Sequence, residues 1–101
     1  MATATGNERF ARHGLAETRK RLRQRFAGNR VLQHAITRIL DSIIDEWDAR
    51  EPLHTESFER LVRAIGGPLD ALESLPLSDA QPAAEQLASA WDEVRGKLVW
   101  G

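Results

Sequence analysis

Three histidines and their acidic neighbours are the first candidates for chemistry in this chain, and they stand at positions 13, 34 and 54. His34, Asp41 and Asp45 share one side of a helix that the sequence pattern predicts over residues 30–49. A zinc ion there would need further ligands from a second helix, and Arg38 lies among these side chains and disfavours a cation. No HExxH motif is present. We therefore predict a solvated polar strip, with no metal site and no cofactor.

Nucleophilic chemistry finds equally little support. The five serines stand at positions 42, 57, 74, 78 and 89, and none lies in a G-x-S-x-G elbow. Gly66 and Gly67 precede a proline, whereas a phosphate loop needs Gly-x-x-x-x-Gly-Lys. The chain has no cysteine. We predict no catalytic residues and a non-enzymatic role, and a small enzyme without a recognisable motif is the second alternative.

The most unusual stretch is RKRLRQRF at 19–26, which carries five positive charges in eight positions. Residues 1–38 hold nine Lys or Arg and two acids, a net of +7, whereas residues 39–101 have a net of −8. Such asymmetry favours contact with a polyanion or pairing between the two halves. The candidate partner-binding residues are Arg19, Lys20, Arg21, Arg23 and Arg25, together with Trp100 near the end of the chain.

Four interpretations of this basic run stay open: a solvated or internally paired face, an acidic protein partner, nucleic acid and an anionic membrane surface. The pI of 6.3 is low for a nucleic-acid-binding domain. On a helical wheel the charges lie on both sides of an apolar stripe rather than on one face. Phe26 belongs to that stripe, so no stacking platform is indicated.

These residues must be positioned by helices, because apolar spacing is helical throughout the chain. Residues 1–6 are predicted to be a flexible tail, and Asn7 is predicted to cap the first helix. Its stripe consists of Ala11, Leu15, Thr18, Leu22 and Phe26. The sequence AGN at 27–29 ends it, with Gly28 suited to a left-handed cap and Asn29 to capping the next helix.

The helix over 30–49 has apolar residues around about 220° of its surface, more than the ~100° of a helix that lies on a surface. It is predicted to be the central helix or part of an oligomer seam. Glu46 projects inside this arc and needs a cation or water. Trp100 would lie opposite the core stripe if the last helix continued to it, so it is predicted to be frayed or docked. Together these features favour self-association.

Three shorter helices are predicted to follow. Thr55 caps the first, and GGP at 66–68 ends it. Pro68 begins a short helix that ends near Leu75. Ser78 and Gln81 form a capping box for the last helix, with Pro82 in its first turn.

A hairpin across 27–29 would place residue i beside residue 57 − i. Arg12 would then meet Asp45, Glu46 or Asp48, while the run at 19–25 would lie beside 32–38, which has no acid. The basic run would be unmatched by the hairpin. It could meet a partner, or the acids of the second half could fold over it, namely Glu51, Glu56, Glu59, Asp70 and Glu73.

The sequence thus predicts an all-α fold, a small bundle of four to five helices around a central hydrophobic helix at 30–49. Residues 7–101 would form a single helical domain. The expected function is a protein–protein interaction module, an adaptor, inhibitor or small accessory subunit, with a homodimer as one form. The first alternative is a nucleic-acid-associated helical protein that uses segment 19–25. The start of the chain has no secretory pattern and no segment reaches the ~20 apolar residues of a membrane span, so we expect a cytoplasmic protein.

Overall fold

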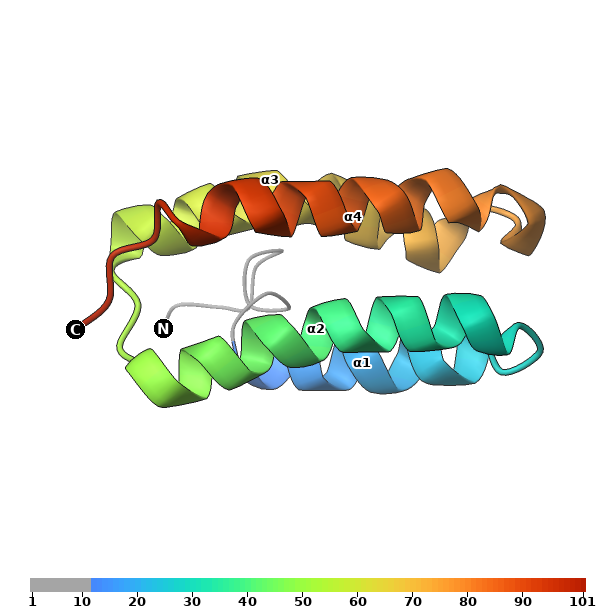
Figure 1. Cartoon of the computed structure of the whole chain (residues 1–101), viewed down its shortest axis with the longest axis horizontal. Coiled ribbons are helices and arrows are strands. Elements are labelled where there is room, and N and C mark those ends of the chain that lie inside the picture. The colour runs from blue at the N-terminus through green and yellow to red at the C-terminus, as the bar shows by residue number, and fades with distance from the viewer. Residues whose placement is uncertain (1–11) are drawn as a thin grey trace, which may run out of the picture.

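The computed structural model describes residues 12–101, and these residues form an all-α bundle of four helices. The helices are α1 (Arg12–Arg25), α2 (Arg30–Arg50), α3 (Thr55–Ser74) and α4 (Ala80–Arg95), with a short 3₁₀ helix η2 (Leu77–Asp79) before α4. Figure 1 shows two layers, the α1–α2 hairpin and the α3–α4 hairpin, whose four axes are nearly aligned. The predicted fold class is confirmed. Asn7, Ala11 and the tail at 1–6 lie outside the described residues.

The core fills the space between the two hairpins and follows the predicted stripes. In α1 the buried residues are Leu15, Thr18 and Leu22, with Phe26 just after the helix. Burying one such side chain contributes about 1.5–3 kcal/mol. The described core consists of Leu15, Leu22, Phe26, Leu32, Ile36, Leu40, Ile43, Ile44, Leu61, Ile65, Leu69, Leu72, Ala80, Ala83, Ala84, Leu87, Trp91, Val94 and Leu98.

Helix α2 packs against α1 in its own layer and against α4 in the other, so it is covered on two sides as its sequence predicts. The apolar arc is nevertheless narrower than predicted. Ile36, Leu40 and Ile44 are buried, but Val31 is 83% exposed and Ala35 also faces solvent. Asn29 caps the helix as predicted, because its side chain accepts a hydrogen bond from the Leu32 amide at 3.1 Å. Gly28 does not have the left-handed conformation that the sequence predicts.

The prediction that GGP ends a helix at 66–68 is wrong, because α3 runs unbroken from Thr55 to Ser74 with Pro68 inside it. Pro68 has no N–H, so the helix loses the backbone hydrogen bond to the Ala64 carbonyl. The proline ring also disfavours a helical conformation of the preceding residue, mainly by a clash with that residue's Cβ. Residue 67 is glycine and has no Cβ, so the second penalty is reduced. Ile65 and Leu69, which flank the Gly-Gly-Pro sequence, are both fully buried. Their packing outweighs the tendency of that sequence to end a helix.

Two predicted caps are also wrong. Ser78 lies within η2, and Gln81 donates to Glu85 instead of closing a capping box. Asp79 is the N-cap of α4 and makes no side-chain hydrogen bond there. Thr55 is the first residue of α3 rather than its cap, a position that His54 takes, again without a side-chain bond. Pro82 does lie in the first turn of α4, as predicted.

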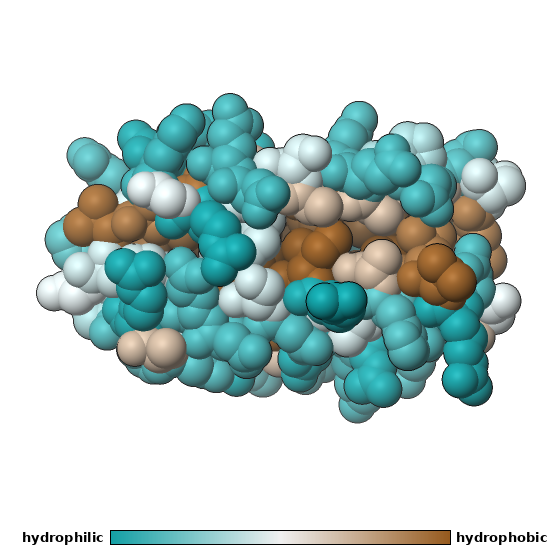
Figure 2. All heavy atoms as spheres, in the orientation of Figure 1, coloured by the Kyte–Doolittle hydropathy of each residue, from teal (hydrophilic) through white to brown (hydrophobic). Residues whose placement is uncertain are grey.

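The surface of the molecule is largely hydrophilic with local apolar exposure. Figure 2 shows one face on which apolar side chains reach the surface along the seam between α2 and α4, between rows of hydrophilic side chains. The large apolar residues that are most exposed are Val31, Leu75, Leu77 and Val99. Within residues 12–101, none of the helices combines the length and the apolar character that crossing a membrane requires.

Candidate functional site

The basic run at 19–25 is divided by the α1 helix into two flanks, and the flank toward α3 makes its hydrogen bonds within the chain. Arg21 donates to Glu73 at 3.0 Å and to Thr18 Oγ1 at 2.9 Å. Arg25 donates to the backbone carbonyl of Leu75. The acidic second half therefore folds over this part of the run, which was one of the two explanations that the sequence left open.

Arg19 corrects a second expectation. The hairpin register places this residue beside residues without an acid, yet its Nη1 lies 2.5 Å from Asp41 Oδ1. Asp41 stands one helical turn beyond the expected neighbours of Arg19, within reach of a long side chain. Of the five basic residues proposed from the sequence, three are thus engaged inside the bundle.

Lys20 and Arg23 form the other flank, and the structure brings them beside α2. One surface pocket between α1 and α2 is lined by Glu17, Arg19, Lys20, Arg23 and the neutral residues Ala16, Gln24, Ala27 and Gln33. A second, adjoining pocket is lined by Arg23, Gln33, His34, Thr37 and Arg38. Gln33 donates to the Arg23 carbonyl at 2.7 Å and joins the two helices there.

We call Lys20, Arg23, His34 and Arg38 the cationic face. Among the residues that the structure describes, Lys20, Arg23 and Arg38 have no ion-pair partner. The sequence predicted Lys20 and Arg23 as binding residues, and the predicted hairpin added the positive charge of Arg38 beside the run. It did not group His34 with them.

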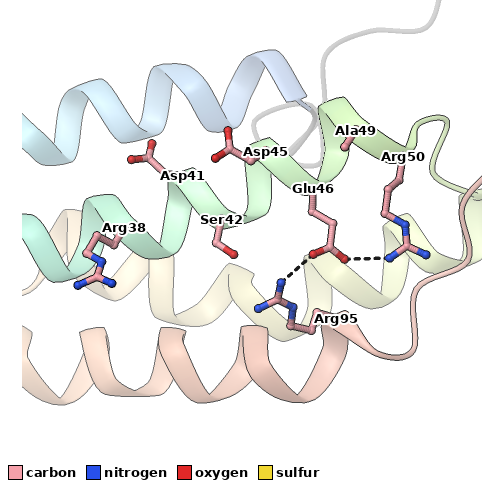
Figure 3. A pocket seen from close by; sticks show the side chains of 8 residues that line it. All are labelled: Arg38, Asp41, Ser42, Asp45, Glu46, Ala49, Arg50 and Arg95. Atoms are coloured by element: carbon pink, nitrogen blue, oxygen red, sulfur yellow. Dashed lines mark hydrogen bonds and ion pairs between the residues drawn. The ribbon is translucent and has the colours of Figure 1, made fainter.

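The outer side of α2 carries a mixed-charge pocket (Figure 3), lined by Arg38, Asp41, Ser42, Asp45, Glu46, Ala49, Arg50 and Arg95. Asp41 and Asp45 point toward α1, whereas Ser42 and Glu46 point toward α4. Ser42 Oγ accepts a hydrogen bond from Trp91 Nε1 at 3.0 Å. The acids and the hydroxyl therefore diverge. Within residues 12–101, no group of three His, Cys, Asp or Glu residues is arranged to hold a metal ion.

Glu46 finds its cations within the chain. It accepts from Arg95 Nη2 at 2.8 Å and from Arg50 Nη1 at 3.3 Å, and its side chain is only 14% exposed. The sequence left water, Arg12 or a cation of a partner as alternatives, and the structure shows two other arginines of the same chain instead. Because its charge is compensated within the chain, Glu46 gives no support to self-association.

Arg12 and Asp48 form a two-pronged ion pair at the other edge of α2, as the hairpin register predicts. Arg12 Nε lies 2.6 Å from Asp48 Oδ1, and Nη2 lies 3.0 Å from Oδ2. The hydrogen bond from Arg12 lowers the pKa of the Asp48 carboxyl, and the same bond raises the pKa of Arg12. The pair lies on the surface and ties the start of α1 to the end of α2.

Trp100 docks on its own bundle, which is one of the outcomes that the sequence left open. Helix α4 ends at Arg95, and the chain returns to form a β-bridge between Trp100 and Leu53. The Trp100 ring meets the Trp47 ring edge-on at 6.2 Å, and the Arg50 guanidinium lies 5.8 Å from its centroid. Trp100 is half-buried in these contacts, and its role in binding a partner stays a prediction.

Comparison of the chain with known protein families, curated proteins and solved structures found no match.

Proposed function

We propose that this protein is a non-enzymatic interaction module that binds an acidic segment of another protein through its cationic face. The observation that carries the proposal is the division of the basic run. Arg21 and Arg25 are engaged toward α3, whereas Lys20 and Arg23 are left toward α2, where Arg38 joins them. Three cations share one side of a hairpin, and Glu17 is the acid in the two pockets that they line. Arg38 also lies beside Asp41 and Asp45 in the mixed-charge pocket, so the positive potential that attracts carboxylates is centred on Lys20 and Arg23.

A protein partner suits this face better than nucleic acid does. The exposed cations are few, and three of the five charges in the run are engaged elsewhere. Nucleic-acid-binding domains usually gather many cations on one surface and have a high pI, whereas this chain has a pI of 6.3. We include a cytoplasmic location in the proposal, because the chain lacks cysteine.

The test compares a glutamate-rich peptide with a DNA duplex by fluorescence anisotropy at low and moderate salt. The variant Lys20→Gln/Arg23→Gln removes two cations of the cationic face. The matched control Arg63→Gln/Lys97→Gln removes two exposed cations that line a different pocket and have no ion-pair partner among the described residues. We expect the first variant to bind the peptide about tenfold more weakly and the control to bind as the wild type does.

Two results would contradict the proposal. Equal losses in both variants would mean that binding follows net charge rather than this face. A duplex that binds more tightly than the peptide, with affinity falling steeply as salt rises, would assign the cationic face to nucleic acid.

A further inference from the structure

Helices α2 and α4 lie side by side and run in the same direction across the two layers (Figure 1). Their side chains meet in a constant register near the ends of both helices. Trp91 donates to Ser42, and Arg95 donates to Glu46, and both pairs are 49 residues apart in the chain. The same register places Ala88 beside Ile39, nearer the start of the helices. The seam is therefore closed by polar bonds at one end only.

The other half of the seam is apolar and reaches solvent. Val31 is 83% exposed, Ala35 and Ala88 also face solvent, and Ile39 is half-buried. Figure 2 shows apolar side chains along this half of the seam, on the side of the two interhelical turns. Exposed apolar patches bounded by polar residues are typical of protein contact sites. We define the apolar strip as Val31, Ala35, Ile39 and Ala88.

The two borders of the apolar strip differ in charge. On the α2 side the next residues around the helix are His34 and Arg38, which belong to the cationic face. On the α4 side the exposed residues Glu85 and Asp92 border the strip. A ligand lying on the strip therefore meets positive charge along one edge and negative charge along the other. This polarity selects both the kind of ligand and its orientation.

We propose that the apolar strip seats an amphipathic helix of another protein, lying along α2, with an acidic flank over the cationic face. The inference deepens the proposed function and rests on it. The strip follows the α2 axis at i, i+4 and i+8 positions, a length of about 12 Å or two helical turns. Its small residues, Ala35 and Ala88, let the ridge of a second helix approach closely. The opposite flank of the ligand is neutral or basic, because it faces Glu85 and Asp92.

A second copy of this chain is the other candidate occupant. An antiparallel pairing of two strips brings Arg38 of one copy toward Arg38 of the other, whereas a parallel pairing sets Arg38 beside Glu85 and Asp92. We retain an acidic partner helix because Lys20 and Arg23 extend the positive side beyond Arg38, and self-association is an outcome of the test.

The experiment selects binders from a displayed library of helical peptides, with the full chain as bait. Ala35→Glu places a negative charge in the middle of the apolar strip at an exposed helical position. Ser89→Glu adds the same charge at an exposed position of α4 away from the strip. Circular dichroism of both variants confirms that the bundle is retained. We expect enriched peptides with apolar residues at i, i+3, i+4 and i+7 and Asp or Glu on one flank. They should lose about tenfold or more in affinity with Ala35→Glu and little with Ser89→Glu.

The outcomes separate this inference from the function on which it rests. Acidic peptides without helical apolar spacing that depend on Lys20 and Arg23 but not on Ala35 would overturn the helix inference and leave the proposed function standing. Peptides indifferent to Lys20→Gln/Arg23→Gln would overturn both. The inference is overturned if the wild-type bait enriches no peptides beyond those that the Ala35→Glu bait enriches. The inference is also overturned if sedimentation equilibrium shows that the wild type is a dimer and that Ala35→Glu dissociates it. The occupant of the strip would then be a second copy of this chain.

Discussion

Arg95 Nη2 lies 2.8 Å from Glu46 Oε1 and joins the last turn of α4 to the last turns of α2. Arg50 approaches the same carboxylate from one turn along α2, at 3.3 Å. Because the Glu46 side chain is only 14% exposed, its charge depends on these two arginines. The contact joins residues from the two opposite halves of the chain and holds the two layers together at this end.

The first prediction concerns this ion pair. Glu46→Gln should lower the free energy of unfolding by about 1–2 kcal/mol, because it removes the negative charge that two arginines share and replaces one acceptor oxygen by a donor. Asp45→Asn changes the exposed neighbouring acid, which makes no hydrogen bond or ion pair among the described residues and interacts with Arg12 only coulombically. This change should stay within about 0.5 kcal/mol of the wild type. Urea unfolding followed by circular dichroism measures both. Equal effects of the two substitutions would show that the Glu46 contacts contribute nothing.

The second prediction is a pH dependence. The hydrogen bond from Arg12 lowers the pKa of Asp48 in the folded protein, so this pair stabilises the fold above the carboxyl's unfolded pKa of about 3.9. That contribution disappears as the pH falls through the lowered folded value. NMR titration of the Asp48 carboxyl carbon should report a pKa below the ordinary value. Arg12→Gln should return it upward, whereas Arg38→Gln should leave it lowered.

The third prediction tests Pro68 within α3. Pro68→Ala should stabilise the protein by about 1–3 kcal/mol, because it restores a backbone N–H toward the Ala64 carbonyl. Gly67→Ala should stabilise by about 0.5–1 kcal/mol in the Pro68→Ala background, since its Cβ meets no atom within 4 Å apart from chain neighbours. In the presence of Pro68 the same change should stabilise less or destabilise. Thermal unfolding of the four proteins measures this coupling, and strict additivity would refute it.

The fourth prediction concerns Trp100. Replacing it by Ala should lower the free energy of unfolding by about 2 kcal/mol, roughly half the value for a fully buried tryptophan. The half-buried ring lies against Trp47 and under Arg50. Val99→Ala, at a side chain that is 51% exposed, should have an effect below about 0.5 kcal/mol. If Trp100→Ala matched that control in urea unfolding, the ring would not be docked in solution.

The fifth prediction separates the buried and exposed parts of the α2 arc. Ile36→Ala should cost about 2–4 kcal/mol of unfolding free energy, because Ile36 is 1% exposed. Val31→Ala should change the free energy by less than about 0.5 kcal/mol, as Val31 is 83% exposed. The unfolding free energy is measured at low micromolar concentration and again after tenfold dilution. A loss of more than 1 kcal/mol in Val31→Ala would show that Val31 is buried between two copies of the chain.

The helices and most of the core could be predicted from the sequence because apolar spacing dominates both. Leu15, Leu22 and Phe26 are buried as the period of 3.6 requires. The α2 start at Arg30 and the cap by Asn29 also follow from local chemistry. Local signals failed where tertiary packing outweighed them. Gly66, Gly67 and Pro68 indicate a break, but burial of Ile65 and Leu69 keeps α3 continuous.

The candidate site could be predicted only in part, because the cations that are available to a partner depend on the contacts that each side chain makes within the bundle. The helical wheel separated Lys20 and Arg23 from Arg21 and Arg25, but all five were candidate binding residues, and only the contacts with α3 show that Arg21 and Arg25 are engaged. The hairpin register predicted the Arg12–Asp48 pair correctly and missed the Arg19–Asp41 pair by one turn. Long arginine side chains reach across a turn, and residue spacing alone does not determine their partners.

The parallel course of α2 and α4 has an electrostatic consequence of its own. Two helix macrodipoles that point the same way place both negative carboxyl ends together, where Arg50 and Arg95 compensate them. Losing Arg95 should therefore be more disruptive than losing Glu46, because the arginine serves the helix ends as well as the carboxylate. At the opposite end the two amino termini lie together without an acid in the first turn of either helix. Backbone dipoles thus add to the attraction for anions near Arg30 and the cationic face.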